Sequence, residues 1–411
     1  MEGKECAIGI CDRQCASFNL LIFSFFARCF FPLSVVYCAL PIVIYLSYMS
    51  SNSFSFQQAA WRRLKKNKGA MFGLVVITLS VLLAIFAYFV SPDSSPYANR
   101  IILEVARQKP GYQQMFLKVK KEKNVVNAGF FEQLLWGKED QYYYVPVANF
   151  KRTRDSIIIQ KFIDEDLSER QSFAISQTDN RNPVVTKRFW LGTDTYGRDI
   201  LSRLIVGVRV SLGVGLVTVI ISLTIGLLLG SLAGYYRGRT DDIITWFMNI
   251  IWGIPTLLLV FAITLVLGKG FWQVFIAVGL TMWVSVARLV RGQVLNVREL
   301  EYVEAARALG FSNPRIIARH IVPNIIGPVM VMAASNFASA IVIEAGLSFL
   351  GVGVQPPQPS WGLMVKENYN FIITQNPMLA LAPGFAIMGL VLAFNLLGNG
   401  LRDALNVKGR I

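Results

Sequence analysis

The chain has 411 residues, of which 54% are hydrophobic and only 16% are charged. Soluble domains carry about 25% charged residues, so the composition excludes the two or three water-soluble domains that the length alone would suggest. Forty Lys and Arg against 25 Asp and Glu give a formal net charge of +15. A basic, apolar chain is typical of an integral membrane protein with positive cytoplasmic loops, so we expect no nucleic-acid partner.

Scarce residue types exclude several kinds of active site. The sequence has one histidine, His320, and its five cysteines all lie within residues 6–38. This excludes a histidine-based metal site, a histidine-dependent triad, and a disulfide framework or thiol nucleophile in the main body. No G-x-x-x-x-G-K-[ST] motif occurs, so the chain has no P-loop for ATP. We expect no metal, no cofactor and no enzymatic activity of its own.

Residues 1–48 differ in pattern from the rest of the chain. Their apolar stretch is interrupted by Arg28, Pro32 and Pro41, and Met49 then begins a polar segment typical of a cytoplasmic amino terminus. Three interpretations compete: an extra transmembrane helix, a signal peptide, and a translation start placed too far upstream. The balanced charges at the start fit a signal peptide poorly. We favour Met49 as the true start, with the extra helix as the main alternative.

Six stretches of the sequence are apolar and long enough to cross a membrane. A transmembrane helix needs about 20 mostly apolar residues, and a charge at its centre costs about 2.5–3.5 kcal/mol on insertion scales. The proline at position 255 is expected to kink the third of them. The predicted spans are Met71–Val90, Val210–Tyr236, Ile243–Gly268, Gly270–Ala287, Ile321–Ile343 and a last one centred on Leu379–Leu397.

Lysine and arginine positions predict the orientation of these spans. Positive loops face the cytoplasm, so we expect both Met49 and the carboxyl terminus to lie inside. Arg198, Arg203 and Arg209 are the exception, because they precede the second span on the outer side. We expect that stretch to lie along the membrane interface. The inward basic segments are 62–68, 237–239, 288–319 and 402–410.

Residues 91–190 are the only sizeable water-soluble part of the chain. Residues 102–108 and 115–123 are helix-like in composition, whereas 141–147 and 156–163 are rich in β-branched and aromatic residues. We therefore predict a small α+β domain outside the membrane, inserted between the first two spans.

The loop before the fifth span is predicted to form two short helices. Its first half, Val297–Leu309, has helical spacing, and Gly310 stands where a helix ends with positive φ. Asn313 and Pro314 are typical of a helix start, and Pro323 is expected to close that second helix. An apolar tip would suit a groove on another protein; it comprises Leu309, Phe311, Ile316 and Ile317.

The sequence of this loop, EAARALGFSNPRIIARHIVPN, resembles the EAA loop of ABC-importer permease subunits. In that family the short helix of the loop seats in a cleft of the cytoplasmic ATPase and transmits its closure to the membrane helices. An ordinary amphipathic connector is the alternative interpretation. Within the loop of residues 297–323, the resemblance implies coupling roles for Glu304, Ala305, Ala306, Leu309, Gly310, Phe311 and Pro323.

Three further segments narrow the resemblance. RFWLGTDTYGRDILSRLIVGVRVSLGVG, EAGLSFLGVGVQPPQPSWG and AFNLLGNGLRDALN are similar to the C-type permease of dipeptide and oligopeptide importers, a binding-protein-dependent transport family. The resemblance implies a bacterial inner-membrane protein with the six-helix type I fold: a cytoplasmic segment at 49–70, a first helix, the insertion, and a five-helix core at 191–411. Substrates would be di- or oligopeptides, with nickel complexes and glutathione left open.

The same resemblance implies partners that supply the energy and the substrate. These are a homologous second permease subunit, two cytoplasmic ABC ATPases and an extracytoplasmic substrate-binding protein, besides membrane lipid. Two other functions remain as alternatives: a secondary carrier acting alone, and a membrane sensor or scaffold that uses residues 91–190. No series of Asp, Glu or His residues crosses the predicted spans, as a proton-coupled carrier would often need.

Single residues within or beside the spans have both structural and functional interpretations. Gly226, Gly230 and Gly234 recur every fourth residue, which favours close helix packing over a direct role in the pathway. Glu344 ends the fifth apolar stretch near the outer face, where it is either a gating or pathway residue or simply reaches water. Trp361 is expected to be an interfacial anchor.

Overall fold

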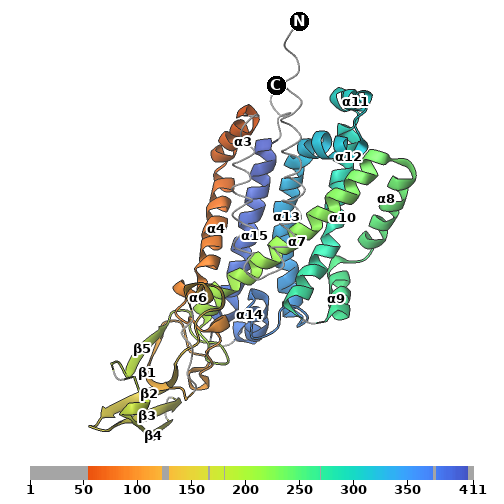
Figure 1. Ribbon diagram of the computed structural model, residues 1–411. Helices are drawn as coiled ribbons and strands as arrows, with labels where there is room; N and C mark the ends of the chain where they lie inside the picture. The colour runs from red at the N-terminus through yellow and green to blue at the C-terminus, as the bar shows by residue number, and fades with distance from the viewer. Residues whose placement is uncertain are drawn as a thin grey trace. The chain divides into compact units, whose positions relative to one another are not determined.

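The computed structural model describes residues 54–122, 129–164, 167–179, 181–268, 270–373 and 376–405. Residues 60–411 form one compact unit. Within it a helical bundle carries a five-stranded antiparallel sheet at one end and the short helices α11 (Glu301–Ala308) and α12 (Asn313–Ile316) at the other (Figure 1). We name these the sheet end and the loop end. The interpretations of residues 1–48 concern a segment outside the described residues.

The predicted spans correspond to helices of the bundle. Five helices in the described part of the chain are long and apolar enough to cross a membrane, and the number rises to six when a bent pair is counted as one span. The long helices are α4 (Lys68–Ile85), α7 (Ile200–Tyr236), α10 (Phe271–Val297), α13 (Val322–Phe349) and α15 (Met378–Leu405); the bent pair is α8 (Gly238–Trp252) and α9 (Thr256–Leu267).

The third span is broken rather than kinked. Helices α8 and α9 meet at an angle of 91°. Gly253 ends α8, and Pro255 directly precedes the first residue of α9. Proline disfavours helical backbone in the residue before it and cannot donate the helical hydrogen bond itself. The helix is interrupted at Pro255 as predicted, but the break of 91° is sharper than the predicted kink.

The first helix of the core, α7, is longer than its uncharged stretch predicts. It begins at Ile200, where Asp199 accepts a hydrogen bond from the backbone N–H of Ser202 at 2.9 Å and caps the helix. The helix therefore includes Arg203 and Arg209, which the sequence placed in a segment along the membrane interface. The stretch is therefore the start of α7 and not a separate segment, and both arginines find partners within the protein.

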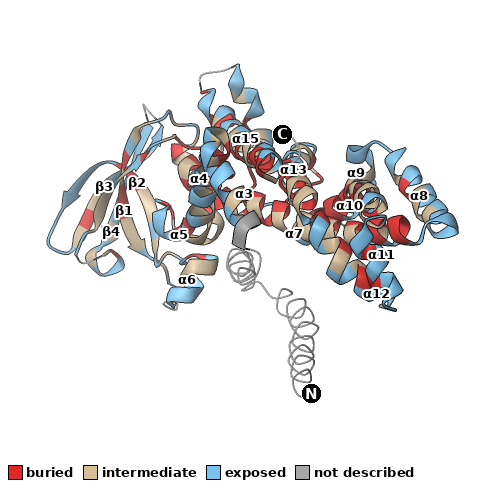
Figure 2. Cartoon of the chain, turned by 90° about the horizontal axis from the view of Figure 1, so that it is seen from above, coloured by how far each residue is buried: buried red, intermediate tan, exposed pale blue. Residues whose placement is uncertain are grey.

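Three glycines of α7 bring this helix close to α10. A Cβ atom built on Gly226 would lie 2.5 Å from Val286, and one on Gly230 would lie 2.6 Å from the carbonyl oxygen of Ala287. Gly234 is equally crowded by α10, with Val294 at 2.8 Å. A side chain at any of these positions would collide with α10, as the predicted packing role requires. Buried stretches of α7 and α10 appear red in Figure 2.

Helix α15 lies between α4 and α13. On one side Gly73 of α4 packs against the backbone of α15, since its Cβ would fall 2.4 Å from the carbonyl of Ala393. On the other side Phe394 stacks on Phe337 of α13 with ring centroids 3.9 Å apart. The helix before it, α14 (Trp361–Asn368), packs against both α13 and α15.

The insertion folds as the predicted α+β unit, with one error in the prediction. The strands are β1 (Tyr112–Lys120), β2 (Tyr142–Arg152), β3 (Ser156–Asp164), β4 (Leu167–Ala174) and β5 (Val184–Phe189), in the order β4-β3-β2-β1-β5. Residues 115–120, which look helix-like, lie in the central strand β1. Pairing with β2 and β5 and burial of Phe116 and Leu117 outweigh the local helix propensity.

Replacing Gly230 by alanine should destabilise the bundle, because the added methyl group has no room against Ala287. Overpacking of this kind costs about 1–3 kcal/mol. Gly292→Ala is the matched control: it lies in α10 with nothing within 4 Å of the added Cβ, so lower backbone entropy should stabilise it by about 0.5–1 kcal/mol. Thermal unfolding in nanodiscs measures both changes; equal effects would refute the packing role of Gly230.

Candidate functional site

The loop between α10 and α13 is built around a helix end at Gly310. This residue has φ +77°, and its N–H donates to the carbonyl of Arg307 at 3.0 Å. The next N–H, of Phe311, donates to the carbonyl of Ala306 at 3.2 Å. These two bonds form a Schellman motif, which needs a residue of left-handed conformation. The predicted role of Gly310 as a helix terminator is therefore confirmed.

Helix α11 has one buried and one exposed face. Val303 and Ala306 are buried in a cluster that includes Tyr235 of α7 and Ile316 of α12. The opposite face is free: Leu309 is 74% exposed, and Glu304 and Ala305 are exposed as well. The loop therefore presents a short helix with an acidic and apolar surface at the loop end of the bundle.

The predicted apolar tip of the loop is only partly present. Leu309 is exposed, but Ile316 has no exposed surface and packs in the loop's own core. Phe311 and Ile317 are partly buried against the same core, and Phe311 also stacks on His320 with ring centroids 5.9 Å apart. Leu309 is thus the member of the predicted tip that is available for a partner.

Three local details of the loop differ from the prediction. Helix α10 ends at Val297, so residues 297–309 are not one helix. Ser312 rather than Asn313 is the N-cap of α12, and Asn313 instead accepts a hydrogen bond from the Tyr235 hydroxyl at 2.8 Å. Pro323 does not close the second helix. It lies in the first turn of α13, where its missing N–H costs little.

The loop is tied to the end of α7 by polar contacts as well as by packing. Arg298 donates to the carbonyl of Tyr235, and Arg237 forms an ion pair with Glu299. A π-helical turn, Ile317–Ile321, joins α12 to α13 without a break in the helical path. Helix α11 is therefore connected to α7 and to α13 at the same time.

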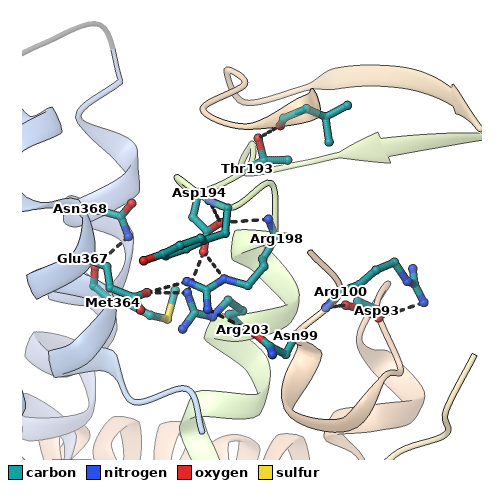
Figure 3. Close-up of polar contacts among 12 residues, drawn as sticks. Asp93, Asn99, Arg100, Thr193, Asp194, Arg198, Arg203, Met364, Glu367 and Asn368 are labelled. Carbon is teal, nitrogen blue, oxygen red and sulfur yellow. Dashed lines mark hydrogen bonds and ion pairs between the residues drawn. The ribbon is translucent and has the colours of Figure 1, made fainter. Parts of the chain in front are cut away.

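A buried cluster of four charged residues lies at the sheet end. Asp194 accepts from Arg198 Nε at 2.6 Å and from Arg203 Nη1 at 2.7 Å, and Glu367 of α14 lies 2.8 Å from both guanidinium groups. Figure 3 shows the two arginines converging between the acids. The cluster has two positive and two negative groups. Asn99 adds an acceptor for Arg198 at 3.2 Å.

The sequence signature GTDTYGRD supplies the backbone of this cluster. Gly197 has φ +72°, and a Cβ on it would lie 1.8 Å from the carbonyl oxygen of Ile102. The hydroxyl of Thr193 donates to the carbonyl of Val105 at 2.5 Å. The motif resemblance singled out this segment, but it did not predict that Arg198 and Arg203 form buried ion pairs. Their partner Glu367 lies at least 164 residues further along the chain, so no local pattern could show the contact.

A second polar cluster lies between the sheet and the bundle. Arg100 forms ion pairs with Asp93 at 3.0 Å and with Asp140. Lys187 of β5 lies over the Tyr144 ring, 3.5 Å from its centroid. Burial, and secondly the positive charge of Arg100, lowers the pKa of Lys187 to about 7. The cluster fixes the sheet on the 93–102 segment without adding a reactive group.

Glu344 and Trp361 are both more deeply buried than the sequence suggests. Glu344 is 1% exposed, and the Ser348 hydroxyl donates to it at 2.6 Å while accepting from the N–H of Val354 at 3.0 Å. The carboxylate thus supports the 350–360 loop and does not reach water. Trp361 is 3% exposed and donates to the carbonyl of Leu204 at 3.0 Å, so it is a packing residue and not an interfacial anchor.

The predicted functional residues do not form one site. Those of the α10–α13 loop lie together at the loop end, whereas Glu344 lies 21 residues along α13 from Pro323, toward the sheet end. Among the described residues no group of three or more His, Cys, Asp or Glu side chains is placed to hold a metal ion. The geometry is therefore that of a helical bundle with one exposed short helix, α11, at the loop end.

Comparison with known proteins identifies the class to which this geometry belongs. Residues 226–409 match the family described as binding-protein-dependent transport system inner membrane component, and residues 55–110 match the N-terminal transmembrane domain of oligopeptide transport permease C. The glutathione transport system permease protein GsiD of Pectobacterium atrosepticum is 41% identical over 230 residues, which are 56% of this chain and 76% of the relative.

Two relatives from Bacillus subtilis extend the match. The oligopeptide transport system permease protein OppC is 38% identical over 254 residues, 62% of this chain and 83% of the relative. The dipeptide transport system permease protein DppC is 32% identical over 358 residues, 87% of this chain and 88% of the relative.

The chain belongs to the family of inner-membrane permease components of binding-protein-dependent ABC importers. It is an integral membrane protein with the helical transmembrane fold of these permeases and a small inserted sheet. Membership implies that it works with the other components of an ABC importer, so a carrier acting alone and a sensor are set aside.

Replacing Arg203 by methionine should lower the free energy of unfolding by about 3–5 kcal/mol, because it leaves buried carboxylates with half of their positive partners. Arg154→Met, an exposed change in the sheet domain, should change stability by about 0.5 kcal/mol or less. Thermal unfolding of the two variants in the same detergent makes the comparison. Equal stabilities would show that the buried cluster contributes nothing.

Proposed function

We propose that the chain is the C-type permease subunit of an ABC importer that moves dipeptides, oligopeptides or a related small solute into the cytoplasm. The observation that carries the proposal is the exposed face of α11, held by its buried face on α7 and α12. The names of the relatives, which are dipeptide, oligopeptide and glutathione permeases, support the substrate class. A homologous permease, two ATPases and a substrate-binding protein would complete the importer.

The loop end is assigned to the cytoplasm. Basic residues gather there at the start of α4, after α7 and along the α10–α13 loop, as the positive-inside rule requires. The outward arginines, which seemed to break the rule, are buried: Arg198 and Arg203 are neutralised by Asp194 and Glu367. The sheet would then lie outside, on the side of the substrate-binding protein.

Coupling would run through the buried face of α11. An ATPase that grips Glu304, Ala305 and Leu309 moves α11 as a rigid piece, because Val303 and Ala306 are packed in the bundle. The hydrogen bond from Tyr235 and the continuous path through the π-helical turn carry this motion into α7 and α13. ATP binding would turn these helices outward, and hydrolysis would reset them.

Glu304→Lys should abolish most ATP-dependent uptake while leaving membrane insertion intact, because the side chain is exposed and takes no part in the fold. We expect the variant to bind the ATPase at least tenfold more weakly, which corresponds to a loss of at least about 1.4 kcal/mol of binding free energy. Asp242→Lys makes the same charge change at an exposed position of α8 and should be tolerated. Uptake and ATPase co-purification in proteoliposomes test this; normal uptake by Glu304→Lys contradicts the coupling role.

The substrate pathway is assigned to a polar face shared by α13 and α15. Ser335 and Ser339 are exposed on α13, and Asn395 and Asn399 are exposed on α15. Among the described residues no hydrogen bond to these four side chains is present. Gly398 of α15 contacts Ala334 of α13. Since each residue is rotated by 100° from the one before, the serine pair and the asparagine pair both lie to one side of this contact.

The depth of these residues argues against lipid as their surroundings. At about 1.5 Å per residue, Ser335 lies at the middle of α13 and Asn395 lies about 5 Å from the middle of α15. Both positions fall within the apolar core, whose half-thickness is about 15 Å. An amide without a partner is costly there, so water, substrate or a second permease subunit must meet this face. A hydrated pathway between two permeases satisfies it.

Asn395→Cys should react with a water-soluble thiol reagent in the assembled importer, and substrate should slow the reaction. The five native cysteines all precede Met49, so a cysteine-free background needs changes only in that segment. Leu79→Cys, on the apolar exposed face of α4 (59% exposed), should react at least about tenfold more slowly, as a buried thiol in lipid does not ionise. Equal inertness of both thiols would refute the pathway assignment, whatever the uptake activity.

A further inference from the structure

Helix α6 (Phe130–Trp136), between β1 and β2, is an apolar segment without a buried side chain. Phe130 is 62% exposed and Phe131 is 71% exposed. Two adjacent phenylalanines this exposed on a small water-facing domain require a partner surface. Trp136, at the other end of the helix, is 48% exposed. The helix therefore presents three aromatic side chains to its surroundings.

Arg209 holds α6 against the end of the first transmembrane helix. This side chain of α7 donates to the carbonyls of Leu134 at 2.7 Å and Leu135 at 3.0 Å, which belong to α6. It also donates to the carbonyls of Ala84 at 2.5 Å and Ile85 at 2.9 Å, the last two residues of α4. One guanidinium group thus satisfies carbonyls at the carboxyl ends of two helices. The position of α6 is fixed at the depth where α4 ends.

The exposed face of α6 continues an apolar face of the first span. Phe130 contacts Phe89 of the short helix α5 (Ala87–Val90), with ring centroids 5.5 Å apart. Below Phe89 the same side of the chain carries exposed Leu79, Leu82 and Phe86, and an open groove along α4 is lined by these residues. A membrane-spanning helix with such a face is in contact with lipid, so α6 extends a lipid-facing surface. Figure 2 shows α6 beside α5, at the edge of the bundle.

We propose that α6 lies in the interfacial layer of the bilayer, with Phe130 and Phe131 inserted between lipid headgroups and acyl chains. A short helix with exposed aromatic residues is suited to this layer. The Arg209 contacts connect it rigidly to α4 and α7. Helix α6 is thereby a second attachment of the insertion to the membrane, besides the chain connections, and it sets the height of the sheet above the bilayer.

A fluorescent probe on single cysteines tests the proposal in the assembled importer in nanodiscs. Phe131→Cys carries the probe on α6, and Phe150→Cys carries it on β2, where the native residue is 43% exposed. The Phe131 probe should lose most of its emission with lipids that bear a quencher near the headgroup, and little with aqueous iodide. The Phe150 probe should show the reverse.

Each other outcome counts against the proposal. Strong iodide quenching at position 131 places α6 in water. Protection from both quenchers, relieved only when the second permease subunit is omitted, makes the surface a protein interface instead of a lipid contact. Phe130→Cys repeats the measurement one residue away, in case the first variant is poorly assembled; its native side chain is also exposed, so the fold does not rest on it.

Discussion

Residues 226, 230 and 234 of α7 are glycines, and atoms of α10 lie where their side chains would otherwise be. This contact sets the position of the loop end. The carboxyl end of α7 carries Tyr235, which packs on Val303 and Ala306 and donates to Asn313. If α10 were held further away, the buried face of α11 would lose its support and the exposed face would have no fixed direction. The placement of α11 therefore depends on glycine, which has no side chain, at three positions of α7.

At the sheet end the bundle is organised by buried ion pairs, whereas at the loop end it is organised by glycines. Helix α7 starts in a cluster of two arginines and two acids that are almost fully buried. Removing charged groups from water is costly, so such clusters persist only when every charge has a partner. Arg209 lies more than one helical turn further along α7. Its guanidinium group donates to four backbone carbonyls and not to a carboxylate. One helix thus joins the inserted sheet, the first span and the loop that we assign to coupling.

Local patterns in the sequence are sufficient to predict the apolar spans and their order, the break at Pro255 and the helix end at Gly310. Each depends on composition or backbone geometry within a few residues. Local patterns were insufficient for β1, whose residues 115–120 look helix-like until β2 and β5 pair with them. They also misplaced Ile316 on the outside of the loop, because the neighbours that bury it come from α7, α10 and α13.

The sequence by itself determined that this is a membrane protein with six apolar spans, a basic side and a loop of recognisable family, since apolar length and charge asymmetry decide insertion. Only the tertiary structure decided which polar groups are buried. Asp194 and Glu367 are far apart in the chain, yet together they neutralise Arg198 and Arg203, and Glu344 is enclosed by the loop that follows it. The energy of a charge depends on what replaces its water, and those replacements come from distant segments that fold beside it.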